Sequence, residues 1–324
     1  ICALAISKDR LMLATSDISA EPKIALWVAL NVAEGPSRVI RGPHLNAITL
    51  LAFDDDKGKT LVSLGADDRH MVAVHDVTSG YLLFMSSTTC RKPFDVAFGN
   101  FGSEIVIVGI KYVLFFTFLA NHAATRHASA SFGRIGRLGT IQSYLSCAYL
   151  PNATCVVGTA DGHLYVFEGS SRELAKSIKA HDGFIYSMDA PWHRAEQVRA
   201  IVLVTGARDG DVKLWNGALE IISKFDNRGA GPIRSVFTSA DSSRILVGSQ
   251  AAAQLREFRT SDGVPTSVAL AGGGAAAGEL WGLAPHPVEK CVATASDDGA
   301  LAVWNIEAPD VRDARRYLTM LAGA

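Results

Sequence analysis

A strand that ends on a bulky side chain recurs seven times along this chain. The last bulky residue of each copy is, in order, Trp27, His75, Phe116, Phe167, Trp215, Phe258 and Trp304, and the intervals between them are 48, 41, 51, 48, 43 and 46 residues. Propeller blades of four strands repeat at roughly 40–45 residues. The repeat therefore predicts an all-β fold, a β-propeller of about seven four-stranded blades.

The fifth repeat shows the content of one unit most clearly. Apolar runs suited to an inner and a second strand are followed by a turn of the Asp-Gly type, which supplies the positive φ of a tight hairpin. Charged Glu220 and Lys224 mark the outer edge strand, where charges discourage pairing with other chains. The predicted strands are 184–190, 200–207, 212–217 and 220–226, and the same turn recurs at Asp161-Gly162, Asp209-Gly210 and Asp298-Gly299.

We expect residues 1–324 to form a single propeller domain, because no linker divides the chain. It opens on Ile1 inside a predicted strand, which favours a fragment of a longer protein. The segment 269–279, rich in Gly and Ala, reads as a loop between blades six and seven, and 309–321 as a helix or the last outer strand. The approximate blade ranges are 1–42, 43–88, 89–133, 134–180, 181–229, 230–274 and 275–324.

Polar residues at fixed places in the fifth unit resemble the buried hydrogen-bonded set of WD-repeat blades. His181 precedes the inner strand, Thr205 lies on the second strand, Asp209 in the turn, and Trp215 ends the third strand. Such a network satisfies buried polar groups and fixes the geometry of a blade. Blade seven keeps Thr294, Asp298 and Trp304 but has the Gly/Ala loop in place of the histidine, so a weaker network is expected there.

Composition excludes several classes of function. The formal net charge is −1 with a pI near 6.8, which argues against non-specific nucleic-acid binding, since that requires a dense basic field. No apolar run reaches the ~18–20 residues of a membrane helix, and no signal peptide is visible. The five scattered cysteines predict buried free thiols in a reducing compartment, where the sequon at Asn152 has no meaning. The cysteines are Cys2, Cys90, Cys147, Cys155 and Cys291.

Three weak motifs point to other chemistry, and each has a plainer interpretation. Cys147 and Cys155 lack the histidine pair of a zinc site. Gly272, Gly274 and Ala277 match a dinucleotide-binding pattern, but a strand rather than a helix follows them, which favours a flexible loop. The run 54–56 lacks the ligand spacing of a calcium loop and reads as a solvated hairpin. We therefore predict no cofactor, no metal and no enzymatic activity.

Several stretches together resemble echinoderm microtubule-associated protein-like (EMAP-like) proteins. "AGELWGLAPHP" is similar to the family's Glu-Leu-Trp-Gly-Leu-Ala-x-His-Pro signature, and "SIKAHDGFIYSM" is the second specific match. Supporting matches in family order are "ICALAISKDRLMLATSD", "VGIKYVLFFTF", "SFGRIG", "GPIRSVF" and "ILVGSQ". The likeness covers nearly all of 1–307 and corresponds to the family's first propeller. Trp281 and Gly282 of the signature read as a packing device between blades.

This resemblance implies a role on microtubules, with tubulin and other cytoskeletal or axonemal proteins as partners. It implies a location in the cytoplasm and cytoskeleton, including the ciliary axoneme. His75, Phe116, Phe167 and Phe258, which stand at tryptophan positions of the repeat, depart from the family pattern and put partner details in doubt. The alternative is a general WD-repeat protein-interaction scaffold without tubulin contact.

One cationic stretch is the sequence's candidate for tubulin contact. Arg126, Arg134 and Arg137 lie between blades three and four, with no acidic residue from 124 to 139. Because microtubule surfaces are acidic and the chain as a whole is nearly neutral, a contact needs such a local patch. The plainer interpretation is a solvated edge whose arginines resist aggregation.

Overall fold

The computed structural model describes most of the chain. The described residues are 2–7, 9–54, 58–99, 102–118, 128–169, 171–191, 201–226, 231–239, 241–250, 254–266, 270–271, 280–285, 291–296, 300–305 and 315–320. Beyond residue 266 the description covers the backbone of the strands only.

Within these residues the strands form seven antiparallel four-stranded sheets, each built from four strands consecutive in sequence. The all-β propeller class expected from the repeat is confirmed. Side chains are described in six of the sheets, and the seventh, β25–β28, is described by its backbone.

The first three blades occupy the first 132 residues. Blade one contains β1 (Ala3–Ile6), β2 (Met12–Ser16), β3 (Lys23–Val28) and β4 (Arg38–Arg41), with the 3₁₀ helix η1 (Ala29–Glu34) between its last two strands. Blade two contains β5 (Ile48–Phe53), β6 (Thr60–Gly65), β7 (Met71–Asp76) and β8 (Leu82–Ser87). Blade three contains β9 (Pro93–Gly99), β10 (Glu104–Gly109), β11 (Tyr112–Phe118) and β12 (Ala128–Phe132).

Blades four to seven repeat this order. Blade four contains β13 (Tyr144–Tyr149), β14 (Cys155–Thr159), β15 (His163–Phe167) and β16 (Leu174–Lys179), and blade five contains β17 (Ile185–Asp189), β18 (Leu203–Ala207), β19 (Asp211–Trp215) and β20 (Ile221–Asp226). Blade six contains β21 (Ile233–Thr238), β22 (Arg244–Ser249), β23 (Gln254–Arg259) and β24 (Leu270–Ala271). Blade seven contains β25 (Leu280–Pro285), β26 (Cys291–Ser296), β27 (Ala300–Asn305) and β28 (Arg315–Met320).

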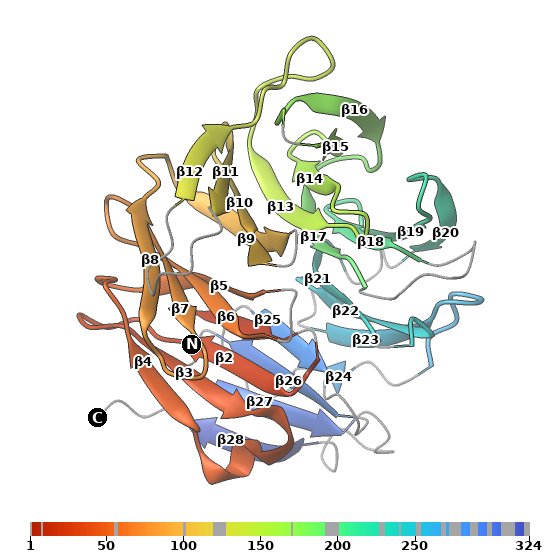
Figure 1. Cartoon of the computed structure of the whole chain (residues 1–324). Helices are drawn as coiled ribbons and strands as arrows, with labels where there is room; N and C mark the ends of the chain where they lie inside the picture. The colour runs from red at the N-terminus through yellow and green to blue at the C-terminus, as the bar shows by residue number, and fades with distance from the viewer. Residues whose placement is uncertain are drawn as a thin grey trace.

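The blades stand in a closed ring. Each inner strand contacts the inner strand of the next blade, from β1 through β5, β9, β13, β17 and β21 to β25, and β25 contacts β1. Figure 1 shows the chain passing around the central axis, with the blue blade seven beside the red blade one. Because every sheet uses strands from one continuous segment, the ring closes by contact between blades one and seven and not by exchange of a strand.

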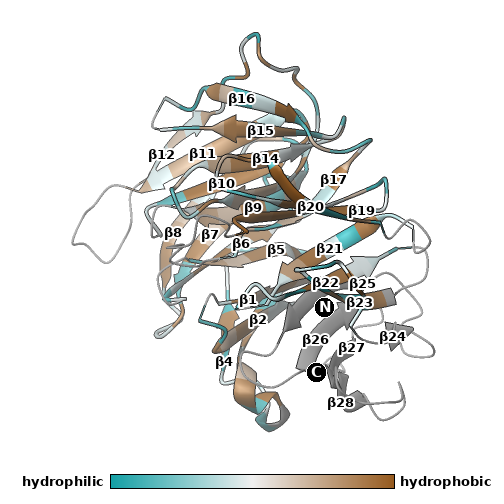
Figure 2. Cartoon of the chain, turned by 90° about the vertical axis from the view of Figure 1, so that its right-hand side faces the viewer, coloured by the Kyte–Doolittle hydropathy of each residue, from teal (hydrophilic) through white to brown (hydrophobic). Residues whose placement is uncertain are grey.

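Apolar side chains fill the spaces between blades. The buried clusters fall between blades one and two, two and three, three and four, four and five, and five and six. The second strands are largely apolar because both of their faces are covered, and Figure 2 shows brown along many of the strands. Phenylalanines at the repeat's bulky position contribute directly: Phe115 meets Phe167 edge-to-face at 5.7 Å, and Phe258 stacks on Phe225 at 6.0 Å.

The inner strand of six blades carries an extra residue near its start. The register between first and second strands shifts there, which is a β-bulge, a feature that re-aims a side chain. The residues at the shift are Thr49, Phe94, Leu145, Tyr186, Arg234 and Trp281. Trp281 of the signature stretch therefore occupies the same register position as Tyr186 and Arg234.

The structure decides between two predicted forms for one segment and corrects the prediction for another. The C-terminal segment, expected as a helix or an outer strand, forms the outer strand β28, which pairs with β27. The segment 269–279 is not all loop, because Leu270 and Ala271 pair with the open edge of β23. Among the described residues, no helix is long and apolar enough to cross a membrane.

The inter-blade packing makes a direct prediction about stability. Phe167 is 3% exposed between blades three and four, whereas Phe132 on the outer strand β12 is 56% exposed. Phe167→Ala should lower the free energy of unfolding by about 3–5 kcal/mol, because it removes buried area and leaves a cavity. Phe132→Ala should change it by less than about 0.5 kcal/mol. Chemical denaturation of both variants measures the difference, and equal effects would contradict the inter-blade placement of Phe167.

Candidate functional site

The four polar residues selected in blade five lie together at the end of the ring where the inner strands begin, here called the entry face. His181 Nε2 is 2.7 Å from Thr205 Oγ1, and Trp215 Nε1 donates to the same oxygen at 3.0 Å. His181 Nδ1 lies 3.1 Å from Asp209 Oδ2. In the neutral ring, with the proton assigned to Nδ1, hydrogen bonds run from Trp215 through Thr205 and His181 to Asp209.

Asp209 is held in its charged form by this arrangement. Burial alone raises its pKa, but hydrogen bonds from His181 and from the backbone N–H groups of Asp182 and Asp211 outweigh burial and hold the pKa well below its usual range. His181, Thr205 and Trp215 are all buried. Hydrogen bonds among buried groups of this kind fix the geometry of a blade.

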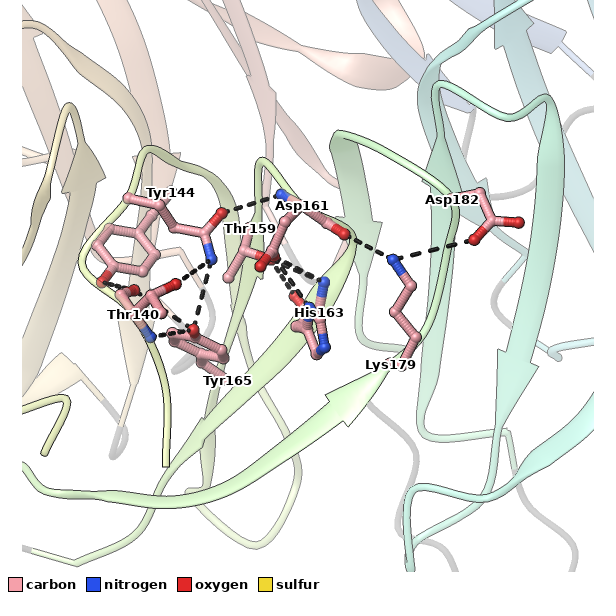
Figure 3. A network of polar contacts seen from close by, with 9 residues as sticks. Thr140, Tyr144, Thr159, Asp161, His163, Tyr165, Lys179 and Asp182 are labelled. Atoms are coloured by element: carbon pink, nitrogen blue, oxygen red, sulfur yellow. Dashed lines mark hydrogen bonds and ion pairs between the residues drawn. The ribbon is translucent and has the colours of Figure 1, made fainter. Parts of the chain in front are cut away.

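The Asp-Gly turn of blade four supports the same histidine. Asp161 accepts from Thr159 Oγ1 at 2.6 Å, and these hydrogen bonds, with those of Gln142 and His163, overcome burial and lower its pKa to about 2. Figure 3 shows this network continuing through Lys179, which donates to the Asp161 carbonyl, to Asp182 of the next blade. Gly162 has φ +84°, and a Cβ there would lie 2.0 Å from the His181 carbonyl oxygen, so only glycine fits.

A second set of residues at the same positions lies in blade two and was missed by the sequence analysis. Its histidine is not hydrogen-bonded to its aspartate, because His44 Nδ1 and Asp67 Oδ2 have no hydrogen-bond partner in the described part of the chain. His44 Nε2 is 2.7 Å from Ser63 Oγ, and Asp67 lies in the following turn. His44 precedes β5 by four residues, as His181 precedes β17, and this spacing is the signal that could have revealed it. Ser63 takes the place of Thr205, and His75 takes the place of Trp215, which hid the pattern.

Two imidazoles are therefore buried side by side in blade two. Burial, and then the neighbouring His75, lowers the pKa of His44 to about 4, with Asp67 opposing. Burial also lowers the pKa of His75 to about 4, which the Gly80 backbone only partly offsets. Both rings are neutral at pH 7, and in the described part of the chain His75 makes no hydrogen bond to another side chain.

The blade-seven set is seen only in part. Thr294 lies on β26 opposite Ala302, and Trp304 lies on β27 opposite Val292. The two residues are therefore two register positions apart, as Thr205 and Trp215 are in blade five. Asp298 lies outside the described residues, as do Gly272, Gly274 and Ala277 of the dinucleotide-like pattern.

The other sequence candidates fall in separate places. Cys147 and Cys155 are buried free thiols on neighbouring strands, and burial raises both pKa values. No cluster of three or more metal-ligating side chains occurs among the described residues. The solvated-hairpin interpretation is wrong for Asp54, which is buried because it accepts hydrogen bonds from the backbone and hydroxyl of Thr60.

Only part of the cationic stretch between blades three and four is described, and one of its arginines is paired with a carboxylate. Arg126 lies outside the described residues, and Arg137 is exposed. Arg134 is exposed, but its guanidinium lies 3.3 Å from Glu173 and also donates to the Ser171 carbonyl. Its backbone pairs with the segment leading into β16, so this stretch joins the outer edges of the two blades.

The ring of sheets and the blade-five network define a WD-repeat β-propeller. The family model "WD domain, G-beta repeat" matches residues 172–216 and 272–305. The Cps50 (Swd1) β-propeller domain of Myceliophteria thermophila superposes with a TM-score of 0.74 over 94% of this chain and 96% of that one, at 16% identity. This last similarity concerns the fold alone.

Among curated proteins, the resemblance to EMAP-like proteins is confirmed. The chain is 24% identical to EMAP-like protein 4 of Xenopus laevis over 93% of its length, and 22% identical to EMAP-like protein 2 of Rattus norvegicus over 95%. It is 23% identical to cilia- and flagella-associated protein 251 of Chlamydomonas reinhardtii over 81%. The chain spans 33%, 46% and 35% of these relatives, respectively.

The blade-five network predicts the effect of removing its histidine. His181→Ala leaves a buried Thr205 hydroxyl and the Asp209 carboxylate without their partner, which should cost roughly 1–3 kcal/mol of stability. The control is His163→Ala, because His163 is partly exposed at the same face. Thermal unfolding of both variants checks this, and an unchanged melting temperature for His181→Ala would contradict the network's structural role.

The blade-two imidazoles predict a pH-dependent stability. The pKa of these histidines is about 6.5 in the unfolded chain and about 4 in the folded one. As the pH falls, they are therefore protonated in the unfolded chain before they are protonated in the folded one. Stability contributed by the neutral rings is complete above about pH 6.5 and is lost as pH falls toward 4. When the melting temperature is measured across this pH range, it should fall less for His75→Phe than for wild type.

Phenylalanine is the chosen replacement because it stands at the equivalent position in blades three, four and six. Phe132→Ala, at an exposed side chain that does not titrate, serves as the control and should decline as wild type does. A decline in His75→Phe as steep as that of wild type would show that His75 is not the group that titrates.

Proposed function

We propose that this chain is a non-catalytic, microtubule-associated propeller that binds tubulin in the cytoplasmic cytoskeleton, including the ciliary axoneme. The observation that carries the proposal is similarity over more than four-fifths of the chain to proteins named for microtubules and for cilia. The polar networks support the non-catalytic part, because their histidines and carboxylates are used to hold turns. Other cytoskeletal or axonemal proteins are the further partners proposed.

The cationic stretch is the proposed place of contact. Arg134 and Arg137 are exposed on the outer edge between blades three and four, where a large partner can approach. Arg126 belongs to the same stretch in sequence. The pairing of Arg134 with Glu173 reduces the positive charge available, so Arg137 and Arg126 carry more of the proposed attraction.

Co-sedimentation with polymerised tubulin tests both parts. Wild-type protein should pellet with microtubules, and the double variant Arg134→Glu/Arg137→Glu should pellet much less at low salt, because charge reversal repels an acidic surface. Raising the salt concentration should reduce the difference, because exposed charges are screened.

A matched control reverses Arg38 and Arg41 on the outer strand of blade one, which changes the net charge equally. If wild type stays in the supernatant, the chain acts as a scaffold without tubulin contact. If wild type pellets and the blade-three/four variant pellets equally well, the function stands and the contact lies elsewhere.

A further inference from the structure

Two arginines and two aromatic rings form a continuous stack on the entry face of blades five and six. The Arg208 guanidinium lies 5.3 Å from the Phe184 ring centre, Phe184 meets Tyr186 edge-to-face at 5.7 Å, and the Arg234 guanidinium lies 4.1 Å from the Tyr186 ring centre. Tyr186 and Arg234 occupy the bulged positions of β17 and β21. We call these four residues the collar.

Tyr186 and Arg234 lie at bulges near the start of two inner strands. Inner strands line the central axis of a propeller, and a bulge turns one side chain out of the regular alternation. Phe94, at the bulged position of blade three, repeats the arrangement with Lys92, whose ammonium lies 6.0 Å from the ring. Aromatic rings beside cations thus recur around this end of the ring.

The guanidinium groups of the collar are held in place and keep their charge available. Arg234 Nε donates to Gln250 Oε1 at 3.0 Å, a neutral partner. Within the described part of the chain no carboxylate pairs with Arg208 or Arg234. The carboxylates adjacent to Arg208 in the network are engaged elsewhere: Asp209 with His181, and Asp182 with Lys179 at 3.9 Å.

We propose that the collar binds an acidic peptide segment at the channel mouth, with its glutamate or aspartate side chains on Arg208 and Arg234. Stacking restricts the arginine side chains before binding, so less conformational entropy is lost when a carboxylate docks. A guanidinium presents a planar fork that suits a carboxylate. The proposal goes beyond tubulin binding, because any partner with such a segment fits.

A single-stranded nucleic acid is the competing anionic ligand, and the geometry favours the peptide. Bases need free ring faces on which to stack, whereas a guanidinium already covers one face of Phe184 and one face of Tyr186. A nucleic acid also needs an extended basic track, whereas the chain has a net charge of −1.

Fluorescence anisotropy with a short labelled peptide of alternating glutamate and glycine tests the collar. Wild type should bind it, and should not bind the same peptide with glutamine in place of glutamate. Arg208→Gln/Arg234→Gln should weaken binding about tenfold or more. Arg38→Gln, at the outer edge of blade one, should leave binding unchanged.

A second pair of variants separates binding from folding. Tyr186→Phe keeps the ring and should bind like wild type, whereas Tyr186→Ala should lose much of the affinity, with melting temperatures compared for both. Absence of peptide binding by wild type, equal binding by the double arginine variant, or tighter binding of an oligouridylate would each overturn the proposal. Microtubule co-sedimentation is read separately, so either proposal can fail alone.

Discussion

Apolar packing between neighbouring sheets is the interaction on which the rest of the structure depends. Among the described side chains the large buried clusters lie between neighbouring blades, and the second strands of blades two, three and four contribute to a cluster on each face. The fold tolerates Phe or His at the repeat's bulky position because a cluster needs volume there and not one particular ring. The same dependence makes the junction between blades one and seven a critical contact, since no shared strand joins them.

Hydrogen bonds between polar groups at the entry face fix the geometry of the packed blades. In blades two and five a histidine before the inner strand reaches a hydroxyl on the second strand, and an acidic turn lies beside it. Blade five is completed by the Trp215 indole, which donates to Thr205. Blade two has His75 at that position and so buries a second imidazole. The two sets share the contact of a histidine with a hydroxyl, and in blade two burial lowers the pKa of both imidazoles to about 4.

The sequence predicted those features that repeat, and it failed where a substitution broke the pattern. Bulky strand ends and Asp-Gly turns are periodic, so the blades followed from spacing. The network of His181, Thr205, Asp209 and Trp215 was expected from the resemblance to WD-repeat blades. The blade-two network escaped because Ser63 and His75 replace the diagnostic residues. The pairing of Arg134 with Glu173 could not be foreseen, because it joins positions 39 residues apart across two blades. Asp54 looked solvated because its contact with Thr60 forms only when the hairpin closes.

The signature tryptophan is best understood through the bulges. Its place in an apolar strand suggested a packing role, but the register places Trp281 at the bulged position that Tyr186 and Arg234 occupy in their own blades. The residues before this position in two of these blades, Ile185 and Ile233, are fully buried. Because the bulge recurs in six blades while its residue varies among Thr, Phe, Leu, Tyr, Arg and Trp, the backbone feature belongs to the fold and the side chain is free to differ. In the blades whose side chains are described, the residue at the bulge is exposed or half-buried, unlike the varied but buried residue at the strand ends, so the bulge position belongs to the surface.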